Sequence, residues 1–307
     1  MNGADVVYHF AAETGVGQSQ VEIARYVSTN THGTAVVLEA AIAAKVQHLI
    51  LASSRAIYGE GQYRCLLCET RFVAKGRTSS NLDIGLWDIY CPACGAPSNA
   101  LPMTEEASPA PTSIYGVTKL QQEELTHSVA RTHNLPATLL RFFNVFGPGQ
   151  SLRNPYTGIL GTFFRRALSG SVAEVYEDGQ MLRDFVFVRD AVDVLESCAG
   201  NDRAFGQTLN VGTGRAVTVL GAAKDVFEAL SIEPRISITG YYRLGDIRHS
   251  LADTIKLESV LGFRPQTPFK DGLQEYVEWA LGNVSDADDV LEEHHLAGQC
   301  LAKPGVR

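Results

Sequence analysis

The sequence of 307 residues has no long hydrophobic run and no excess of positive charge. Its apolar stretches, such as Ala40–Ala44 and Leu49–Ser53, are far shorter than the roughly 20 residues that a membrane-spanning helix needs. Lysine and arginine number 26 against 34 aspartate and glutamate, a net charge of −8. We therefore expect neither a membrane nor a nucleic acid as partner. The apolar stretches are too short for a membrane, and no excess of lysine and arginine is present to bind along a phosphate backbone. No basic segment followed by an apolar one opens the chain, so no secretory signal is expected.

What the sequence does contain is a composition typical of a globular protein. Hydrophobic residues make up 45% and charged residues 20%, and the length exceeds one typical domain but falls short of three. Four of the six cysteines form two Cys-x-x-Cys pairs. In a chain of this size without a secretory signal, that pattern indicates reduced thiols or bound metal, so we expect a cytoplasmic protein.

Segments with strand and helix character alternate along most of the chain. Apolar runs rich in β-branched and aromatic residues predict strands at 5–10, 47–52 and 136–146, and helical spacing predicts helices at 30–45 and 113–133. Further patterns predict strands near 172 and at 184–188 and 207–211, and helices at 162–168 and 217–230. The alternation predicts an α/β fold with a parallel sheet and crossover helices.

The segment SIYGVTK carries a tyrosine and a lysine four positions apart. On a helix this spacing places Tyr115 and Lys119 on one face. A free tyrosine, with a pKa of about 10, is too rarely ionised to act as a base at neutral pH. A neighbouring ammonium stabilises the phenolate and makes it a usable proton acceptor. The spacing is also common by chance, in which case the tyrosine packs and the lysine is solvated.

A second candidate element is the run LILASSRAIYG, which reaches Ser53 and Ser54 at the expected end of a strand. The carboxyl ends of parallel strands are where such sheets bind ligands. A hydroxyl there could hydrogen-bond a substrate oxygen and the tyrosine. Serines at a strand end can equally form only a turn.

The four paired cysteines are Cys65, Cys68, Cys91 and Cys94, in the pattern C-x2-C-x22-C-x2-C. This is the spacing of zinc-ribbon-like sites, in which four thiolates surround the ion tetrahedrally. A closed four-thiolate site has no open position. The sequence therefore predicts a structural zinc that folds an otherwise coreless segment at 61–101. Unliganded thiols or a redox pair are the alternatives.

Taken in order, the motifs resemble those of the extended short-chain dehydrogenase/reductases, in particular the NAD-dependent nucleotide-sugar epimerases and dehydratases. The resemblance runs from about residue 5 to 281, apart from the cysteine segment, and rests on DVVYHFAAETGVGQS, NTHGT, SSRAIYG, YGVTK, RFFNVFGPGQ, RDFVFVRD, NVGTG and GDIRHSLAD. The cysteine segment after SSRAIYGEG is similar to that of the dTDP-L-rhamnose 4-epimerase-like branch of this family.

The resemblance implies roles for individual residues. The catalytic residues would be Ser54, Tyr115 and Lys119. The positions lining the NAD cofactor would be Phe10, Ala11, Ala12, Asn30, Ser53, Tyr115 and Lys119. The diphosphate of a nucleotide-sugar substrate would be bound by Asn144, Arg183 and Arg248. Guanidinium geometry suits bidentate contacts to such a group, although either arginine taken alone is more often part of a surface salt bridge.

The residues after Ser54 indicate which reaction the resemblance implies. Related dehydratases carry there an Asp-Glu pair that expels water, whereas this sequence has Arg55 and Ala56, which cannot do that acid–base work. The implied activity is therefore a nucleotide-sugar 4-epimerase that oxidises C4 transiently with bound NAD, on dTDP-L-rhamnose or a related dTDP or UDP sugar. Another nucleotide-sugar reductase or decarboxylase, and a non-catalytic sugar-nucleotide-binding remnant, are the alternatives.

The glycine-rich G-x-x-G-x-x-G turn that opens the family's dinucleotide-binding domain does not occur in these 307 residues. We therefore expect a Rossmann-like, doubly wound parallel sheet that lacks its first strands, with either a start upstream or an incomplete cofactor site. The expected truncated dinucleotide-binding domain spans 1–149, with the insertion 61–101. A smaller α+β substrate domain spans 150–283, of which 184–206 packs back on the first domain, and 284–307 forms a tail. The resemblance also implies a homodimer.

Overall fold

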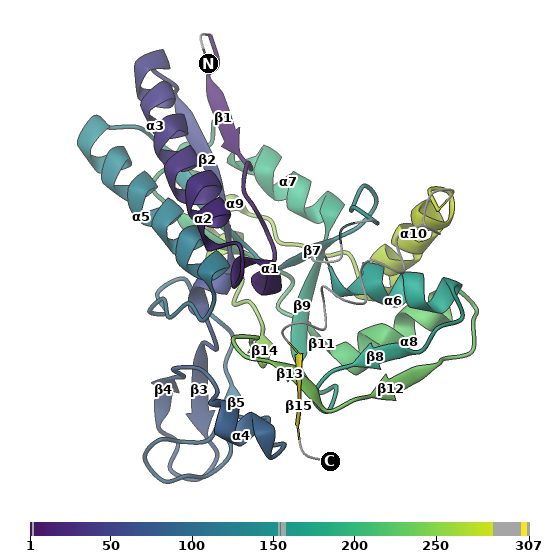
Figure 1. Ribbon diagram of the computed structural model, residues 1–307. Coiled ribbons are helices and arrows are strands. Elements are labelled where there is room, and N and C mark those ends of the chain that lie inside the picture. Colours follow the sequence, from purple (N-terminus) through teal and green to yellow (C-terminus); the bar gives the residue numbers. More distant parts are fainter. Residues whose placement is uncertain (2, 153, 155–157, 285–301, 306–307) are drawn as a thin grey trace.

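The computed structural model describes residues 1, 3–152, 154, 158–284 and 302–305. Its central feature is a sheet of four parallel strands in the order β1-β2-β6-β10. These strands are β1 (Val6–His9), β2 (His48–Ser54), β6 (Ala137–Phe142) and β10 (Thr208–Val211). β1 lies at one edge, and within the described ranges no strand pairs with its outer side (Figure 1).

Helices cover both faces of this sheet, because strands in a parallel sheet are buried on both sides. The covering helices are α3 (Gly33–Ala44), α5 (Ile114–His133), α7 (Val188–Cys198) and α9 (Ile255–Leu261). Leu49 and Leu51 of β2 join the apolar cluster under α3 and α5, and Ile50 joins the cluster under α7 and α9. Successive strand residues point to opposite faces, so this one strand anchors both layers. The parallel, Rossmann-like α/β fold is confirmed.

Short helical turns connect the main elements. They are α1 (Val16–Ser19), α2 (Ile23–Tyr26), the π-helix η1 (Val27–His32) and the 3-10 helices η2 (Arg55–Tyr58) and η3 (Asp202–Ala204). The first three lead from β1 into α3, and η2 follows the carboxyl end of β2. η2 therefore lies at the edge of the sheet where a ligand is expected.

Apart from the cysteine segment, the remaining strands form a second layer beside the main sheet (Figure 1). Its strands are β7 (Asn144–Phe146), β8 (Ala173–Val175), β9 (Leu182–Phe187), β11 (Ala216–Thr218), β12 (Ile236–Ile238), β13 (Tyr241–Arg243), β14 (His249–Ser250) and β15 (Ala302–Pro304). β9 pairs with β11, β14 and β7, while β8 pairs with β12 and β13 with β15. One apolar cluster unites β7, β8, β9, β11 and β12 with α6 (Ile159–Leu168), α8 (Val219–Ala229) and α10 (Phe269–Leu281).

The cysteine segment forms a small unit below the main sheet in Figure 1. Its elements are β3 (Gln62–Cys65), β4 (Arg71–Val73), α4 (Ser79–Asp83) and β5 (Ser98–Ala100). The strands pair antiparallel in the order β4-β3-β5, around a cluster of Tyr63, Ala74 and Ile89. The segment is therefore ordered around a few apolar side chains, where the sequence indicated no core.

Most predicted strands and helices lie within a few residues of their expected positions. The prediction of a single strand at 136–146 is wrong, because the strand is interrupted after Phe142. β6 belongs to the main sheet, whereas β7 pairs with β9. β10 and α9 lie within 150–283, the range predicted for the substrate domain, but they pack in and against the main sheet. Of the predicted tail 284–307, residues 285–301 and 306–307 lie outside the described residues. None of the helices in the described ranges combines the length and apolar character that crossing a membrane requires.

Candidate active site

Two elements bring Ser54 and Tyr115 together. β2 ends at Ser54, whose hydroxyl accepts a hydrogen bond from the Ala56 amide at 3.1 Å and so starts η2. α5 begins after Ser113, whose hydroxyl accepts from the Gly116 amide at 3.1 Å, and this places Tyr115 in the first helical turn. The Ser54 side chain lies close enough to Tyr115 to lower the pKa of the phenol. The hydroxyl and the phenol therefore form a pair through which a proton can pass.

The charges around Tyr115 differ from those expected. Burial raises the pKa of Tyr115, whereas the Ser54 hydroxyl and the charge of Arg55 lower it. The ammonium of Lys119 lies 6.0 Å from the ring centroid of Tyr115 and donates to the Ala52 carbonyl at 2.9 Å. Burial lowers the pKa of Lys119 to about 8. Arg55, rather than Lys119, is therefore the cation that lowers the pKa of the phenol.

Two of the predicted cofactor positions are engaged in internal hydrogen bonds. The Ser53 hydroxyl donates to the carboxylate of Glu123 at 2.5 Å. The side chain of Asn30 accepts from the amide of Glu13 at 2.7 Å and donates to its carbonyl at 3.1 Å. It also donates to the hydroxyl of Thr118 at 2.9 Å. Asn30 therefore ties the loop after β1 to helix α5.

The other predicted cofactor positions, Phe10, Ala11 and Ala12, follow β1 at its carboxyl end. Phe10 is 50% exposed, and its ring stacks on that of Tyr8 with 6.0 Å between the centroids. Ala11 is exposed and Ala12 is partly buried. These residues therefore remain accessible at the edge of the sheet where dinucleotides bind to such folds.

Asn144 and Arg183 lie on the neighbouring strands β7 and β9. The Oδ1 atom of Asn144 is buried and has no hydrogen-bond partner within the described ranges. The guanidinium of Arg183 donates through Nη1 to the carbonyls of Leu182 at 2.8 Å and Arg248 at 3.1 Å. Burial lowers the pKa of Arg183, and no carboxylate of the described residues pairs with it. Both side chains retain hydrogen-bonding capacity for a ligand.

Arg248 occupies a different environment. Its side chain is 1% exposed and pairs with Asp88 at 2.8 Å, Glu177 at 2.9 Å and Asp178 at 2.7 Å. A second bond to Asp178, at 2.8 Å, makes that contact bidentate. A guanidinium with three carboxylate partners has little capacity left for a diphosphate. Its role in substrate binding stays a prediction, which requires these ion pairs to open.

The same ion pairs connect the cysteine insertion to the second layer. Arg77 of the insertion pairs with Glu60 at 2.9 Å and with Glu177 at 2.8 Å, and Glu177 also pairs with Arg248. All four side chains are at most 4% exposed. Arg77 also donates to the Asp246 carbonyl at 2.8 Å. A buried charge network therefore holds the insertion to the segment that carries Arg248.

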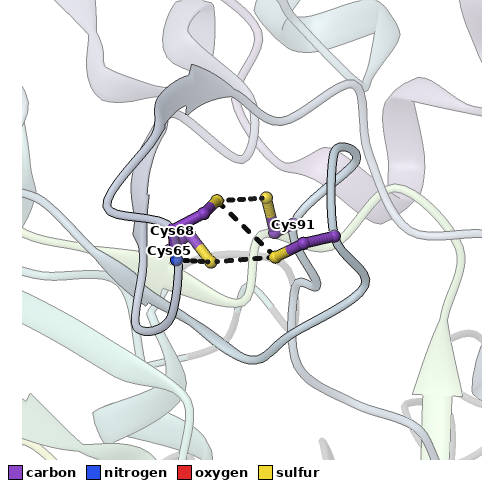
Figure 2. Close-up of side chains that lie close together, drawn as sticks. Cys65, Cys68 and Cys91 are labelled. Carbon is purple, nitrogen blue, oxygen red and sulfur yellow. Dashed lines mark hydrogen bonds between the residues drawn. The ribbon is translucent and has the colours of Figure 1, made fainter.

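The four cysteines lie together in the insertion, and their sulfur atoms are all within 4.8 Å of one another. Sγ of Cys65 is 3.4 Å from that of Cys94, and Sγ of Cys68 is 3.6 Å from that of Cys91. Figure 2 shows the side chains of Cys65, Cys68 and Cys91 meeting at one point. The amides of Leu67 and Cys68 donate to the sulfur of Cys65 at 3.3 Å. The arrangement offers one ligand atom from each cysteine.

Sequence reasoning assigns no structural role to three charged residues of this region, Arg55, Glu60 and Arg77. For the first two a signal exists, because both interrupt the apolar turn SSRAIYGEG directly after Ser54. For Arg77 there is none, since its partner Glu177 lies 100 positions away in the sequence.

A parallel sheet whose carboxyl edge carries a serine, and a helix that places tyrosine and lysine beside it, define a Rossmann-like enzyme of the short-chain dehydrogenase/reductase class. Comparison with known families agrees. The chain belongs to the NAD dependent epimerase/dehydratase family, whose family model matches residues 1–74 and 91–212. The expected family, and with it an enzyme, is confirmed.

Individual relatives extend the match along the chain. It is 35% identical to the dTDP-L-rhamnose 4-epimerase of Burkholderia thailandensis over 278 residues, which cover 90% of this chain and 74% of that protein. It is 27% identical to the UDP-N-acetyl-alpha-D-glucosaminuronate decarboxylase of Bacillus cytotoxicus, with 91% and 77% covered. The solved structure of the UDP-glucose 4-epimerase of Thermotoga maritima with UDP-glucose matches at a TM-score of 0.74 and 29% identity, over 92% of this chain and 78% of that one. MoeE5 in complex with UDP-glucuronic acid and NAD matches at 0.74 and 30%, over 92% and 81%.

Proposed function

We propose that this chain is an NAD-dependent nucleotide-sugar 4-epimerase. The observation that carries the proposal is the placement of the Ser54 hydroxyl beside the Tyr115 phenol, next to Arg55 and Ala56 where the related dehydratases carry an acid–base pair. A hydroxyl–phenol pair can exchange one proton with a sugar hydroxyl, which is what oxidation at a single carbon requires. Expulsion of water needs a second acid and base, for which positions 55 and 56 offer no carboxyl group.

In this proposal Tyr115 takes the proton of the C4 hydroxyl and later returns it. The Ala56 amide fixes the orientation of the Ser54 hydroxyl, which can then donate to the phenolate oxygen. The charge of Arg55 favours the phenolate, because an opposite charge nearby stabilises the ionised form. The hydride chemistry at C4 would be supplied by NAD when bound, without net oxidation of the sugar.

The described residues fit one end of an NAD molecule. Lys119 donates one of its three N–H groups to the Ala52 carbonyl, and it makes no other hydrogen bond with the described part of the chain. Its remaining donors suit the hydroxyls of the nicotinamide ribose. The accessible Phe10 and Ala11 stand at the same edge of the sheet. These residues would hold the ribose and line the cofactor.

We propose dTDP-L-rhamnose, or a related dTDP or UDP sugar, as the substrate. The 35% identity to a dTDP-L-rhamnose 4-epimerase supports the choice. Asn144 and Arg183 support binding of the diphosphate, since among the described residues the amide oxygen has no hydrogen-bond partner and the guanidinium has no carboxylate partner. Arg248 would contribute only when its contacts to carboxylates open.

The experiment that tests the proposal incubates the purified chain with NAD and dTDP-L-rhamnose and follows the configuration at C4 by NMR. We expect inversion by the wild type and its loss in Tyr115→Phe. Dehydration of dTDP-glucose without inversion of dTDP-L-rhamnose would overturn the proposal. Release of CO2 from a UDP-linked uronic acid would favour a decarboxylase, a second candidate because of the relative at 27% identity. Net NADH consumption would indicate a reductase, and nucleotide binding without NAD binding a non-catalytic remnant.

We further propose that the four cysteines bind a structural zinc ion. Tetrahedral coordination with Zn–S bonds of about 2.3 Å places the sulfurs about 3.8 Å apart. The contacts of 3.4 Å and 3.6 Å between the sulfurs are close to this separation. Four thiolates leave no open position, so the ion would order the insertion and take no part in catalysis.

We also propose a homodimer that works in the cytoplasm. Helices α3 and α5 lie side by side and expose Val36 and Val117, which supports a second copy as their partner (Figure 1). Four neighbouring free cysteines are typical of a reducing compartment. Analytical ultracentrifugation tests the dimer, and a monomer at micromolar concentration would contradict it.

A further inference from the structure

Arg55 is the first residue of η2 and follows Ser54 directly. Its guanidinium makes no hydrogen bond and no ion pair with the described residues, and its Nη1 atom is shielded from solvent. Burial, and then the nearby Arg183, lower the pKa of Arg55 to about 9. Because a guanidinium carries five N–H donors, the turn after Ser54 holds a cation whose donors are unused.

The nearest carboxylates do not satisfy this cation. Glu60 is engaged by Arg77 at 2.9 Å and by the Arg248 amide at 2.7 Å. Asp246 acts on Arg55 only from beyond ion-pair distance. A buried charge without a partner loses its hydration and gains nothing in return, which makes it unfavourable in a ligand-free protein.

Arg141 and Arg77, which are also buried, are paired with carboxylates. Arg141 bonds to Glu123 at 2.7 Å and to the Tyr58 hydroxyl at 2.8 Å, and Arg77 has two carboxylate partners. These two arginines therefore have partners within the fold. Among the described residues Arg55 has no such partner, although it stands next to the proposed catalytic pair, so its partner is expected to come from outside the chain.

We propose that Arg55 is a substrate-binding residue, whose guanidinium binds an anionic oxygen group of the nucleotide sugar beside Ser54 and Tyr115. The inference rests on the proposed function. Two groups of a nucleotide sugar carry such oxygens. One is the diphosphate, which Arg55 would bind together with Arg183. The other is the carboxylate of a uronic acid, the kind of sugar that MoeE5 binds. Either group can accept two parallel N–H bonds from a planar guanidinium.

Calorimetric titration of the whole chain with four ligands separates these sources. dTDP and UDP present only the diphosphate, UDP-glucose adds a neutral sugar, and UDP-glucuronic acid adds a carboxylate. Arg55→Met removes the charge at similar length, and Arg55→Lys keeps the charge but loses the planar fork. Arg131→Met is the control, since Arg131 is exposed near the far end of α5.

If Arg55 binds the diphosphate, Arg55→Met weakens all four ligands by roughly 10- to 100-fold. If it binds a sugar carboxylate, only UDP-glucuronic acid loses affinity by that factor. Arg55→Lys should retain part of the affinity in either case, and Arg131→Met all of it. Unchanged affinity of Arg55→Met for every ligand overturns the inference and leaves the proposed function standing. A wild-type chain that binds none of the four overturns both.

Thermal unfolding without ligand gives an independent readout. Since Arg55 has no partner among the described residues, Arg55→Met is expected to raise the melting temperature of the ligand-free chain. Loss of an arginine that stabilises the fold, such as Arg77, is expected to lower the melting temperature. A lower melting temperature together with unchanged affinity would show that Arg55 stabilises the folded chain and does not bind substrate, which would contradict the proposal.

Discussion

Gly116 of α5 lies directly against the main-chain carbonyl of Ala56 in η2. A Cβ atom at position 116 would stand 2.6 Å from the Ala56 oxygen and 3.0 Å from Cβ of Pro111. The absence of a side chain therefore lets the first turn of α5 approach the turn that follows Ser54. This contact sets how closely the Ser54 hydroxyl and the Tyr115 phenol approach each other.

Gly116→Ala is expected to push α5 away from η2 and to slow epimerisation roughly 100-fold, because misplacing reacting groups by about 1 Å has effects of that size. Overpacking should also lower the free energy of unfolding by about 1–3 kcal/mol. Gly282→Ala is the matched control, since a Cβ there would lie 3.5 Å from its nearest neighbour, the Trp279 oxygen. Steady-state rates and urea unfolding of both variants check this. A Gly116→Ala enzyme with wild-type rate would show that the contact does not align the pair.

The cysteine insertion is expected to stabilise the rest of the chain through Arg77. Arg77→Met leaves Glu60 and Glu177 buried without that partner, so we expect a loss of about 3–5 kcal/mol in the free energy of unfolding. Arg64→Met in the same insertion is the control, because Arg64 is 46% exposed in its pair with Glu69. Exposed pairs contribute less than about 1 kcal/mol. Urea unfolding compares the two, and equally small losses would contradict a stabilising role of the buried network.

Local patterns suffice for features whose residues are close in the sequence. The helix at 113–133 and the shared face of Tyr115 and Lys119 follow from spacing alone. β2 follows from a run of apolar residues, because a central parallel strand is buried on both faces. The turn at Ser54 follows from its place at the end of that strand. These are the features that sequence and structure have in common.

Partners far apart in the sequence cannot be read from such patterns. Arg248 is matched to a motif, but the carboxylates of Asp178 and Asp88 that it contacts lie 70 and 160 positions away. Asn30 likewise bonds to Thr118, 88 positions away. A motif shows which residues occupy a turn but not which groups compete for their donors. The charge network around Arg248 was for this reason not predictable.

Lys119 is expected to make the stability of the chain depend on pH above neutrality. Burial lowers its pKa from 10.5 to about 8. Between these values the unfolded chain holds a proton on this lysine that the folded chain has released, so the lysine's contribution to stability rises with pH. Below about pH 8 both states are protonated, and the buried charge costs about 3 kcal/mol relative to the neutral form.

Lys119→Met removes this dependence. The stability of the variant relative to wild type should be higher at about pH 7 than at about pH 9.5. At the higher pH the lysine of the folded wild type is deprotonated, so the cost of its buried charge is gone. Urea unfolding of both proteins at the two pH values measures this, since other groups titrate alike in both and cancel. A difference that does not change with pH would mean that the pKa of Lys119 is not lowered.

The four-cysteine cluster is expected to hold about one zinc ion per chain. Cys91→Ser removes one thiolate and should release the ion, whereas Cys198→Ala, a buried cysteine on α7 outside the cluster, should retain it. Without the ion, amides of 61–101 should lose protection in hydrogen exchange. Because Arg77 in this segment pairs with Glu177, protection should also fall in the second layer. Elemental analysis together with hydrogen exchange checks both effects, and a zinc content well below one per wild-type chain would contradict the metal site.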